Sequence, residues 1–356
     1  MARALRLTEH GRHTATPNPN VGCVIVKNGR VIGEGWHEKA GTAHAEVNAL
    51  NACAEMPAGA TVYVTLEPCA HHGRTPPCSE ALIAAGVGRV VAALEDPNPQ
   101  VSGKGLEALR LAGIRADIGL MAEQARVVHR GFLSRMRRGR PWVTVKLGTS
   151  LDGRTALGNG ASRWITGPDA RRDVHELRAR SCAVLTGIGT VLADNPQLTV
   201  RDVPCRRQPL RVLLDSRLEV ADDANILQGG NALIVTATGS EDRADALRAR
   251  GFDVLRVPTE AVKGKVDLEH MMRSLAARGL NEILVETGAK LNGSLLKAGV
   301  VDEIVAYVAP SVLGDLALGM FALGELTELG NRIPLKFTDV RQIGTDLRIT
   351  ANVLEN

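Results

Sequence analysis

The chain has 356 residues, which at roughly 150 residues per domain indicates two domains. Apolar residues make up 44% and charged residues 23% of the sequence, a balance that is typical of globular proteins and excludes a disordered or fibrous chain. No apolar run approaches about 18 residues, so we expect no transmembrane helix, and the first residues lack the apolar stretch of a secretory signal. Six cysteines are too few for a disulfide scaffold and fit the reducing cytoplasm.

The formal net charge of +4 is unevenly distributed. Residues 1–141 contain 17 Lys and Arg against 12 Asp and Glu, and the remaining residues contain 26 against 27. Much of the basic excess lies in an Arg-rich stretch at 130–140. Nucleic-acid-binding proteins usually combine a basic face with aromatic side chains, and aromatic residues make up only 3% here. We therefore interpret the stretch as a solvated linker or helix end and expect no nucleic-acid partner.

In the first part of the chain, predicted strands alternate with predicted helices. Two apolar segments at 23–26 and 31–33 flank Asn28-Gly29, a pair that favours a two-residue hairpin turn. The elements expected after this hairpin are a helix at 43–54, a strand at 61–66, a helix at 79–85, a strand at 89–94 and a helix at 106–111. This alternation predicts a sheet that is covered by helices and is mostly parallel after the first hairpin.

Pro141 ends the Arg-rich stretch, and a second alternating series begins there with a strand at 142–147. We therefore place a boundary near residue 141, with domains at 1–141 and 142–356. Later strands are expected at 183–186, 210–214, 232–236, 254–257, 282–285 and 303–308. Helices are expected at 170–180, 242–250, 267–278 and 291–298.

Three residues in the first part form a candidate metal site. His44 and Glu46 lie in an H-A-E segment, Cys69 follows a proline, and Cys78 follows two prolines. One imidazole and two thiolates form a zinc ligand set that leaves a fourth position open for water. Glu46, at a helix start, is placed to move protons to and from that water. Zinc-dependent base deaminases carry the same order, H-x-E followed by P-C-x-x-C, although here eight residues rather than two separate the cysteines.

The segment between the two cysteines contains a rival ligand, His72, three residues after Cys69. Cys78 is preferred because its place after two prolines resembles a helix start, where the positive end of the helix dipole favours a thiolate. Taken singly, the cysteines would be core thiols and His44 a surface residue, but together and in this order they predict zinc. The remaining cysteines have no such partners and are interpreted as small core or surface residues: Cys23, Cys53, Cys182 and Cys205.

Further motifs extend this pattern across the chain. They are P-N-P-N-V-G at 17–22, T-L-E-P-C-A-H-H-G-R-T-P-P-C at 65–78, K-L-G-T-S-L-D-G-R at 146–154, S-R-W-I-T at 162–166, V-L-A-D-N-P at 191–196 and E-T-G at 286–288. Together with H-A-E, these segments resemble the bifunctional riboflavin-biosynthesis deaminase/reductase family. The long insertion between the cysteines is itself a mark of that family. The resemblance covers nearly the whole chain, and the linked pair of motif sets is more specific than either set alone.

The resemblance implies an α/β fold class, with an N-terminal cytidine-deaminase-like zinc domain and a C-terminal dihydrofolate-reductase-like domain. It implies zinc-dependent hydrolytic deamination of 2,5-diamino-6-ribosylamino-4(3H)-pyrimidinone 5′-phosphate, followed by NADPH-dependent reduction of the ribosyl side chain. The product would be 5-amino-6-ribitylaminouracil 5′-phosphate. The cofactors would be Zn²⁺ and NADPH, the substrate a phosphorylated pyrimidine, and the assembly a cytoplasmic homo-oligomer without a membrane or nucleic-acid partner.

Position-matching to this family implies roles for residues of both domains. In the first domain, His44, Cys69 and Cys78 would bind zinc, Glu46 would be catalytic, and Asn20 would line the base pocket. The loop residues His71, His72 and Arg74 either meet the substrate edge or phosphate, or stabilise their own loop. In the second domain, NADPH would contact Gly148, Trp164, Thr190, Asp194, Ser216, Gly288, Ala289, Lys290, Leu291, Asn292, Gly293 and Ser294. The substrate would contact Ser162, Arg178, Leu198, Arg201 and Glu286.

The second domain has no G-x-G-x-x-G fingerprint after a strand. The segment 288–294 is a better phosphate cradle because N–H groups at a helix start bind phosphate oxygens, although such glycines alone are more often turn or packing residues. Arg178 and Arg201 suit a 5′-phosphate through their fork-shaped guanidinium groups; alone, each would be a solvated charge. Hydride transfer depends on close positioning, so no proton donor is nominated there.

Three other functions stay open at this point. One is a nucleic-acid deaminase with an appended domain, which the modest net charge and the nine aromatic residues disfavour. Another is a zinc-stapled binding protein in which Glu46 is incidental. The third is a working reductase joined to a vestigial deaminase, which is disfavoured because all four key deaminase positions are filled.

Overall fold

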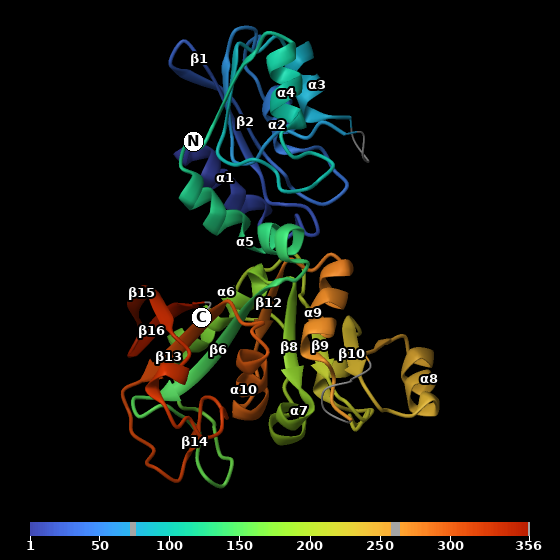
Figure 1. Cartoon of the computed structure of the whole chain (residues 1–356), viewed down its shortest axis with the longest axis vertical. Helices are drawn as coiled ribbons and strands as arrows, with labels where there is room; N and C mark the ends of the chain where they lie inside the picture. The colour runs from blue at the N-terminus through green and yellow to red at the C-terminus, as the bar shows by residue number, and fades with distance from the viewer. Residues whose placement is uncertain (72–75, 258–263, 355–356) are drawn as a thin grey trace. The chain divides into compact units, whose positions relative to one another are not determined.

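The computed structural model describes residues 1–71, 76–257 and 264–354 (Figure 1). The chain divides into two compact units, Met1–Arg140 and Pro141–Asn356. Each unit consists of a β-sheet with helices packed against it, which confirms the α/β class that the alternation of strands and helices predicts. Within the described ranges, no helix is both long enough and apolar enough to cross a bilayer.

The first unit contains a five-stranded sheet with strand order β2-β1-β3-β4-β5. The predicted hairpin is confirmed: β1 and β2 are antiparallel, and Asn28 (φ 48°) and Gly29 (φ 76°) both adopt the left-handed conformation that the turn requires. β1 is also antiparallel to β3, and the strands that follow the hairpin, β3-β4-β5, are parallel to one another, as predicted. The strands are β1 Gly22–Lys27, β2 Arg30–Trp36, β3 Thr61–Val64, β4 Arg89–Ala92 and β5 Arg115–Ile118.

Helices cover both faces of this sheet. Buried residues of α2, α3 and α4 share one core with β1, β3 and β4, and those of α1 and α5 share a second core with Leu66, Ala93 and Leu94. The helices are α1 Ala2–Gly11, α2 Ala45–Asn51, α3 Cys78–Ala84, α4 Lys104–Leu111 and α5 Ala122–Arg138. No prediction covered β5, α1 or the first part of α5. The Arg-rich stretch forms the end of α5, which stops before Gly139 (φ 65°), so of the two interpretations the helix end is confirmed and the linker is wrong.

The second unit contains a nine-stranded sheet with strand order β11-β10-β9-β8-β12-β6-β13-β16-β15. The strands from β11 to β13 are parallel to their neighbours, whereas β16 is antiparallel to both β13 and β15. The strands are β6 Trp142–Ser150, β8 Ala183–Gly187, β9 Leu210–Leu214, β10 Ala232–Thr236, β11 Asp253–Arg256, β12 Glu282–Val285, β13 Glu303–Ala309, β15 Leu335–Ile343 and β16 Asp346–Val353; β7 Arg154–Ala156 pairs separately with β14 Leu318–Gly319.

The helices of the second unit also cover both faces of the sheet. Buried residues of α9 and α10 pack in one core, and buried residues of α6 and α8 pack in another. The helices are α6 Pro168–Arg180, α7 Ile188–Asp194, α8 Glu241–Ala249, α9 Leu268–Ala277 and α10 Ala289–Lys297, with 3₁₀ turns at Asn225–Leu227 and Leu329–Asn331. β7, α7, β14, β15 and β16 were not predicted. Because the strands from β11 to β13 are parallel, their carboxyl ends lie along one edge, where ligands of open α/β sheets usually bind.

Candidate functional sites

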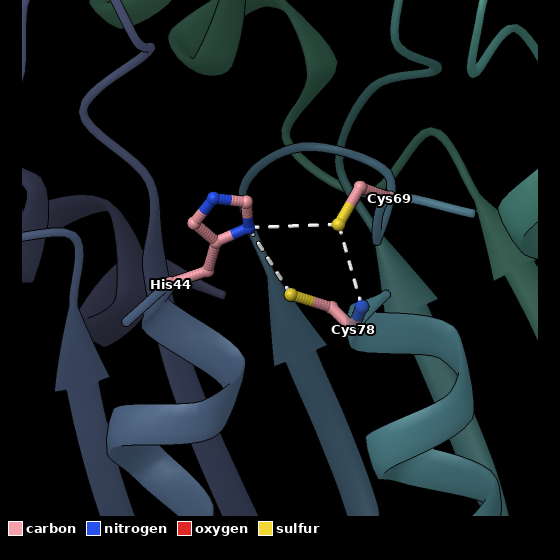
Figure 2. Close-up of side chains that lie close together, drawn as sticks. All are labelled: His44, Cys69 and Cys78. Carbon is pink, nitrogen blue, oxygen red and sulfur yellow. Dashed lines mark hydrogen bonds between the residues drawn. The ribbon is translucent and has the colours of Figure 1, made fainter. Parts of the chain in front are cut away.

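His44, Cys69 and Cys78 converge in the first unit (Figure 2). His44 Nδ1 lies 3.5 Å from Cys69 Sγ and 3.3 Å from Cys78 Sγ. Their three ligand atoms lie within 4.8 Å of one another, and they form the one such group of at least three His, Cys, Asp or Glu side chains found among the described residues. An imidazole and two sulfurs around a common point are a donor set that suits Zn²⁺ and leaves a fourth position open.

The local backbone explains why these three side chains meet. His44 is the N-cap of α2, with an extended backbone (φ −76°, ψ 166°), and Cys78 is the first residue of α3. Cys69 lies on the loop after β3, and its Sγ accepts a hydrogen bond from the backbone N–H of Cys78 (3.3 Å). The positive end of α3 therefore faces Cys69 Sγ, which favours a thiolate at this point.

The two thiols share their protons unequally. A hydrogen bond from Cys78, assisted by His44, lowers the pKa of Cys69 to about 4. The neighbouring sulfur and burial raise the pKa of Cys78 far above its usual value. One thiolate therefore forms readily, and a second is opposed unless a cation neutralises the pair. Because a bound divalent metal deprotonates coordinating thiols, the chemistry of this donor set fits zinc.

Glu46 lies beside this cluster in the first turn of α2, and only 3% of its surface is exposed. Burial and the charge of Cys69 raise the pKa of Glu46 to about 7. A carboxyl group with a pKa near neutrality can both accept and return a proton at physiological pH. The predicted catalytic residue and the predicted ligands therefore share one site.

Of the remaining predicted residues of the first unit, two lie in the described part of the chain and two lie outside it. Asn20 is partly exposed on the loop before β1. His71 is also partly exposed, and its Nδ1 is buried without a hydrogen-bond partner in the described part of the chain. His72, the rival ligand, and Arg74 both lie outside the described residues.

A second histidine supports His44, and its role was not predicted. His37 is buried, its ring lies edge-on to the ring of His44 at 5.2 Å between centroids, and burial lowers its pKa. His37 Nδ1 lies 3.1 Å from the carbonyl oxygen of Ala43, and Nε2 lies 3.1 Å from Asn18 Nδ2. These partners assign the proton to Nδ1 and leave Nε2 to accept from Asn18. The P-N-P-N motif contains Asn18, so its repeated asparagine was the available signal.

In the second unit, Glu286 joins two cations at the carboxyl edge of the sheet. Arg178 Nε and Nη2 donate to its two carboxylate oxygens at 2.5 and 3.0 Å, and Lys146 Nζ lies at 3.4 Å. Burial opposes ionisation of Glu286, but the charges of Arg178 and Lys146 outweigh it and lower the pKa to about 2. Arg178, expected to bind a phosphate, is thus held by a carboxylate of its own chain. Lys146 was not nominated, although it opens a quoted motif.

Arg201 lies on a neighbouring loop and is exposed. Its Nη1 donates to the side chains of Gln197 (3.0 Å) and Thr199 (3.1 Å). Its backbone N–H donates to Nδ1 of the buried His175 at 3.2 Å. Because Leu198 is buried, its side chain faces the protein interior. Its backbone has a positive φ of 55° and forms part of the loop that carries Arg201.

The other predicted cofactor and substrate residues of the second unit each have close neighbours within it. Ser162 donates to Asp194 (3.5 Å), and the hydroxyl groups of Thr190 and Thr287 are 3.3 Å apart. Trp164 is 70% exposed, with the Arg171 guanidinium 4.6 Å from its ring centroid. Gly148 lies near the end of β6, and a Cβ built on it would contact Thr166. Ser216 lies just after β9, and its carbonyl oxygen accepts hydrogen bonds from the backbone N–H groups of Ala237 and Thr238, which follow β10.

The predicted phosphate cradle divides into two parts. Gly288 is the N-cap of α10 and is exposed, as are Lys290 and Ser294; Ala289 and Leu291 are partly exposed. Asn292 is instead 1% exposed, and its amide donates to the carbonyl oxygens of Thr287 and Met320. A Cβ on Gly293 would lie 2.3 Å from the carbonyl oxygen of Ala322. Residues 292 and 293 therefore hold the helix in place, and only its first turn is open to a phosphate.

Two family models match the chain. Residues 141–349 match the family described as "RibD C-terminal domain". Residues 1–94 match the "Cytidine and deoxycytidylate deaminase zinc-binding region".

Individual proteins are similar to the chain over almost its whole length. It is 49% identical to the riboflavin biosynthesis protein RibD of Escherichia coli (strain K12), over 98% of this chain and 96% of that protein. A solved structure of Acinetobacter baumannii RibD has 42% identity and a TM-score of 0.90, covering 99% of this chain and 98% of that one. A Thermotoga maritima structure, described as a diaminohydroxyphosphoribosylaminopyrimidine deaminase/5-amino-6-(5-phosphoribosylamino)uracil reductase, has 32% identity and a TM-score of 0.87, covering 99% and 97%.

Proposed function

Since the chain belongs to the RibD family of riboflavin biosynthesis proteins, we propose that Met1–Arg140 carries out its deamination and Pro141–Asn356 its reduction. The protein is a bifunctional deaminase and reductase of riboflavin biosynthesis that uses Zn²⁺ and NADPH. Its first substrate is 2,5-diamino-6-ribosylamino-4(3H)-pyrimidinone 5′-phosphate. Water replaces the ring amine, which leaves as ammonia, and the ribosyl group of the product is then reduced to a ribityl chain.

The convergence of His44, Cys69 and Cys78 beside Glu46 is the observation that carries the deaminase assignment. These three residues would hold zinc, which supplies the Lewis acidity that lowers the pKa of a water towards neutrality. Glu46 accepts a proton from the attacking water and returns it to the departing amine, since its pKa lies near 7. His37 holds the ring of His44 from the side, and Asn20 lines the pocket for the pyrimidine.

The reductase assignment is supported by the groups at the carboxyl edge of the second sheet. NADPH supplies the hydride, and the open first turn of α10 offers N–H groups to its phosphates. Trp164, Thr190 and Asp194 would contact the cofactor, as would Gly148 and Ser216. Ser162, Arg201 and the Lys146–Glu286–Arg178 group would bind and orient the sugar phosphate, bringing the reacting carbon close to the cofactor.

One experiment tests both halves. The purified protein is incubated with the diaminopyrimidine substrate and NADPH, and ammonia release and NADPH oxidation are followed separately. We expect ammonia release without NADPH, and NADPH oxidation only after deamination. NADPH oxidation with no ammonia release would leave a reductase without the proposed deaminase.

We also infer that the protein is a cytoplasmic homo-oligomer. The family resemblance suggests an assembly, and β15 supports one: it is an edge strand of nine residues on which Phe337 is 68% and Val340 57% exposed. Long edge strands with apolar side chains are open to pairing with another chain. Sedimentation at micromolar concentration tests the assembly, and a monomer there contradicts it.

A further inference from the structure

The carboxylate of Glu67 accepts four backbone hydrogen bonds. Oε1 accepts from Gly105 N (2.9 Å) and Leu106 N (3.1 Å), and Oε2 accepts from Gly103 N (3.0 Å) and Asp96 N (3.1 Å). Only 3% of Glu67 is exposed. A carboxylate has about four lone-pair sites, so this side chain uses its full hydrogen-bonding capacity within the protein.

Three of these donors belong to the N-terminal turn of α4. The first N–H groups of a helix have no partner inside the helix. The N-cap of α4 is Gly103, which has no side chain to satisfy them. Glu67 lies 36 residues earlier in the chain than Gly103 and fills this role from a different segment. It thereby joins the loop after β3 to α4.

Glu67 directly precedes the Pro68–Cys69 dipeptide of the metal centre. Its own N–H donates to the carbonyl oxygen of Leu94 (2.9 Å), which ties its backbone to the strand β4 side of the sheet. The carbonyl oxygen of Pro68 rests directly on α4: a Cβ built on Gly105 would lie 1.9 Å from it. The contact is therefore possible only because residue 105 is glycine.

Cys69 is held from its other side by α3. Its carbonyl oxygen accepts hydrogen bonds from the backbone N–H and the hydroxyl of Ser79, both at 3.1 Å. α3 also carries Cys78. The position of Cys69 Sγ relative to Cys78 Sγ thus depends on two anchors, one on α3 through Ser79 and one on α4 through Glu67.

We propose that Glu67 is a positioning residue of the metal centre, whose four hydrogen bonds fix Cys69 Sγ at the distance from His44 and Cys78 that a metal requires. This proposal rests on the proposed function, since it takes those three side chains as the zinc ligands. Groups that orient metal ligands typically change metal affinity or activity 10–100-fold when they are removed.

Glu67→Gln tests the proposal with little change in shape. The amide keeps one oxygen, but its NH₂ group faces two N–H donors, so two of the four hydrogen bonds are lost. We expect Zn²⁺ affinity, measured by competition with a chelator, to fall 10–100-fold. In the Co²⁺-loaded protein, the sulfur-to-cobalt and d–d absorption bands should shift. The first unit should keep a cooperative thermal unfolding transition, which shows that it is folded. Reduction of supplied deaminated intermediate should stay at the wild-type rate, because that reaction is assigned to the second unit.

Two further variants separate positioning from charge and from folding. Glu107→Gln removes an exposed carboxylate from the first turn of the same helix, so it matches the charge change without touching Cys69, and it should leave affinity and spectrum unchanged. Gly105→Ala keeps Glu67 but presses on the Pro68 carbonyl oxygen from α4. It should weaken Zn²⁺ binding and shift the Co²⁺ spectrum in the same direction as Glu67→Gln.

The outcomes distinguish this proposal from the one it rests on. A folded Glu67→Gln protein with wild-type Zn²⁺ affinity and Co²⁺ spectrum overturns the positioning role alone. If Glu67→Gln does not fold, unchanged affinity and spectrum in Gly105→Ala overturn it. Equal losses in Glu67→Gln and Glu107→Gln make the effect one of charge and also overturn it. A wild-type protein that binds no Zn²⁺, or a Cys69→Ala protein that retains it, overturns the metal centre and the positioning role together.

Discussion

At the residue scale, the ionisation of one side chain of the metal site affects the protonation of another. Cys69 ionises with a pKa of about 4, and the same thiolate helps burial to raise the pKa of Glu46 to about 7. Cys69, a predicted metal ligand, thus helps to keep Glu46, the predicted proton carrier, protonated near neutral pH. A metal ion changes this balance by neutralising the thiolates. Loss of either cysteine should therefore affect both metal binding and the protonation of Glu46.

The ligand assignment gives the first prediction. We expect about one Zn²⁺ per chain, by elemental analysis, because three protein ligands converge on one point. Cys69→Ala and Cys78→Ala should lose the metal, whereas His72→Ala should keep it. Zn²⁺ that is retained by Cys78→Ala and lost by His72→Ala would exchange these two residues in the ligand set.

A buried histidine remote from the metal gives the second prediction. Burial lowers the pKa of His129 to about 4, while its Nε2 lies 3.2 Å from the Thr65 hydroxyl oxygen. An unfolded histidine has a pKa of about 6.5, so the unfolded state binds the proton more tightly and stability is lost as pH falls from about 6.5 to about 4. Between pH 7 and 5 this histidine should lower the free energy of unfolding by about 2 kcal/mol.

The measurement compares the pH dependence of urea unfolding in wild type and His129→Gln at saturating Zn²⁺. The variant should show the shallower loss of stability, whatever its stability at pH 7. His10→Gln, at an exposed position on α1, is the control and should keep the wild-type slope. Parallel curves for wild type and His129→Gln would contradict the prediction.

At the scale of elements, helix starts carry most of the chemistry: α2 and α3 present His44 and Cys78, α4 binds Glu67, and α10 offers its first turn. These starts must be held still to be useful. α10 is held by the contact between Gly293 and the Ala322 carbonyl oxygen, which leaves no room for a side chain.

The third prediction follows from that contact. Gly293→Ala should destabilise the second unit by about 1–3 kcal/mol, the usual range for overpacking, and weaken NADPH binding because the first turn of α10 shifts. Gly288→Ala is the matched control for stability, since a Cβ there meets no atom within 4 Å in this structure. Thermal unfolding with and without NADPH measures both effects. Equal melting temperatures for Gly293→Ala and wild type would contradict the first.

Helices and strands were predictable where a short sequence pattern by itself indicates the structure. Asn28-Gly29 announces the hairpin, and the buried parallel strands read as short apolar runs. α5 was missed because its arginines obscure the apolar residues Phe132 and Leu133, which are buried against the sheet. β15 was missed because it lies at an edge with nearly every residue exposed, so burial imposes no pattern on it.

The site residues were likewise predictable only where they lie in short motifs. The metal ligands sit in short motifs, whereas Glu67, His37 and Lys146 act through contacts with distant segments. Lys146 meets Glu286 across 140 residues of sequence, and no spacing rule reports such a pair. The reverse also holds: Asn292 lies in a motif, but its side chain binds backbone carbonyls of its own chain.

At the scale of the whole molecule, each of the two units has its own sheet and its own cores. The fourth prediction is that their activities can be abolished separately. Glu46→Ala should keep Zn²⁺ yet lose ammonia release by at least the 10²–10⁴-fold that general acid–base catalysis typically contributes. It should also stop oxidising NADPH with the starting pyrimidine, because the second step lacks its substrate.

Supplying the deaminated intermediate to Glu46→Ala should restore NADPH oxidation. Arg201→Ala should do the converse: it should release ammonia normally and raise the KM for the intermediate, whose phosphate it would bind. A folded, metallated Glu46→Ala protein that cannot reduce the supplied intermediate would refute separate sites.

The central position of β6 also governs the order in which the protein is made. β6 begins the second unit, yet its Trp142 pairs with Glu282 and its Thr144 with Glu303. As a nascent chain emerges from the ribosome, the first unit is complete at residue 140, while β6 must wait for partners translated long afterwards. Such distant pairing slows folding and exposes apolar strands in the interval. The first unit can therefore fold and bind Zn²⁺ while the second unit is still being synthesised.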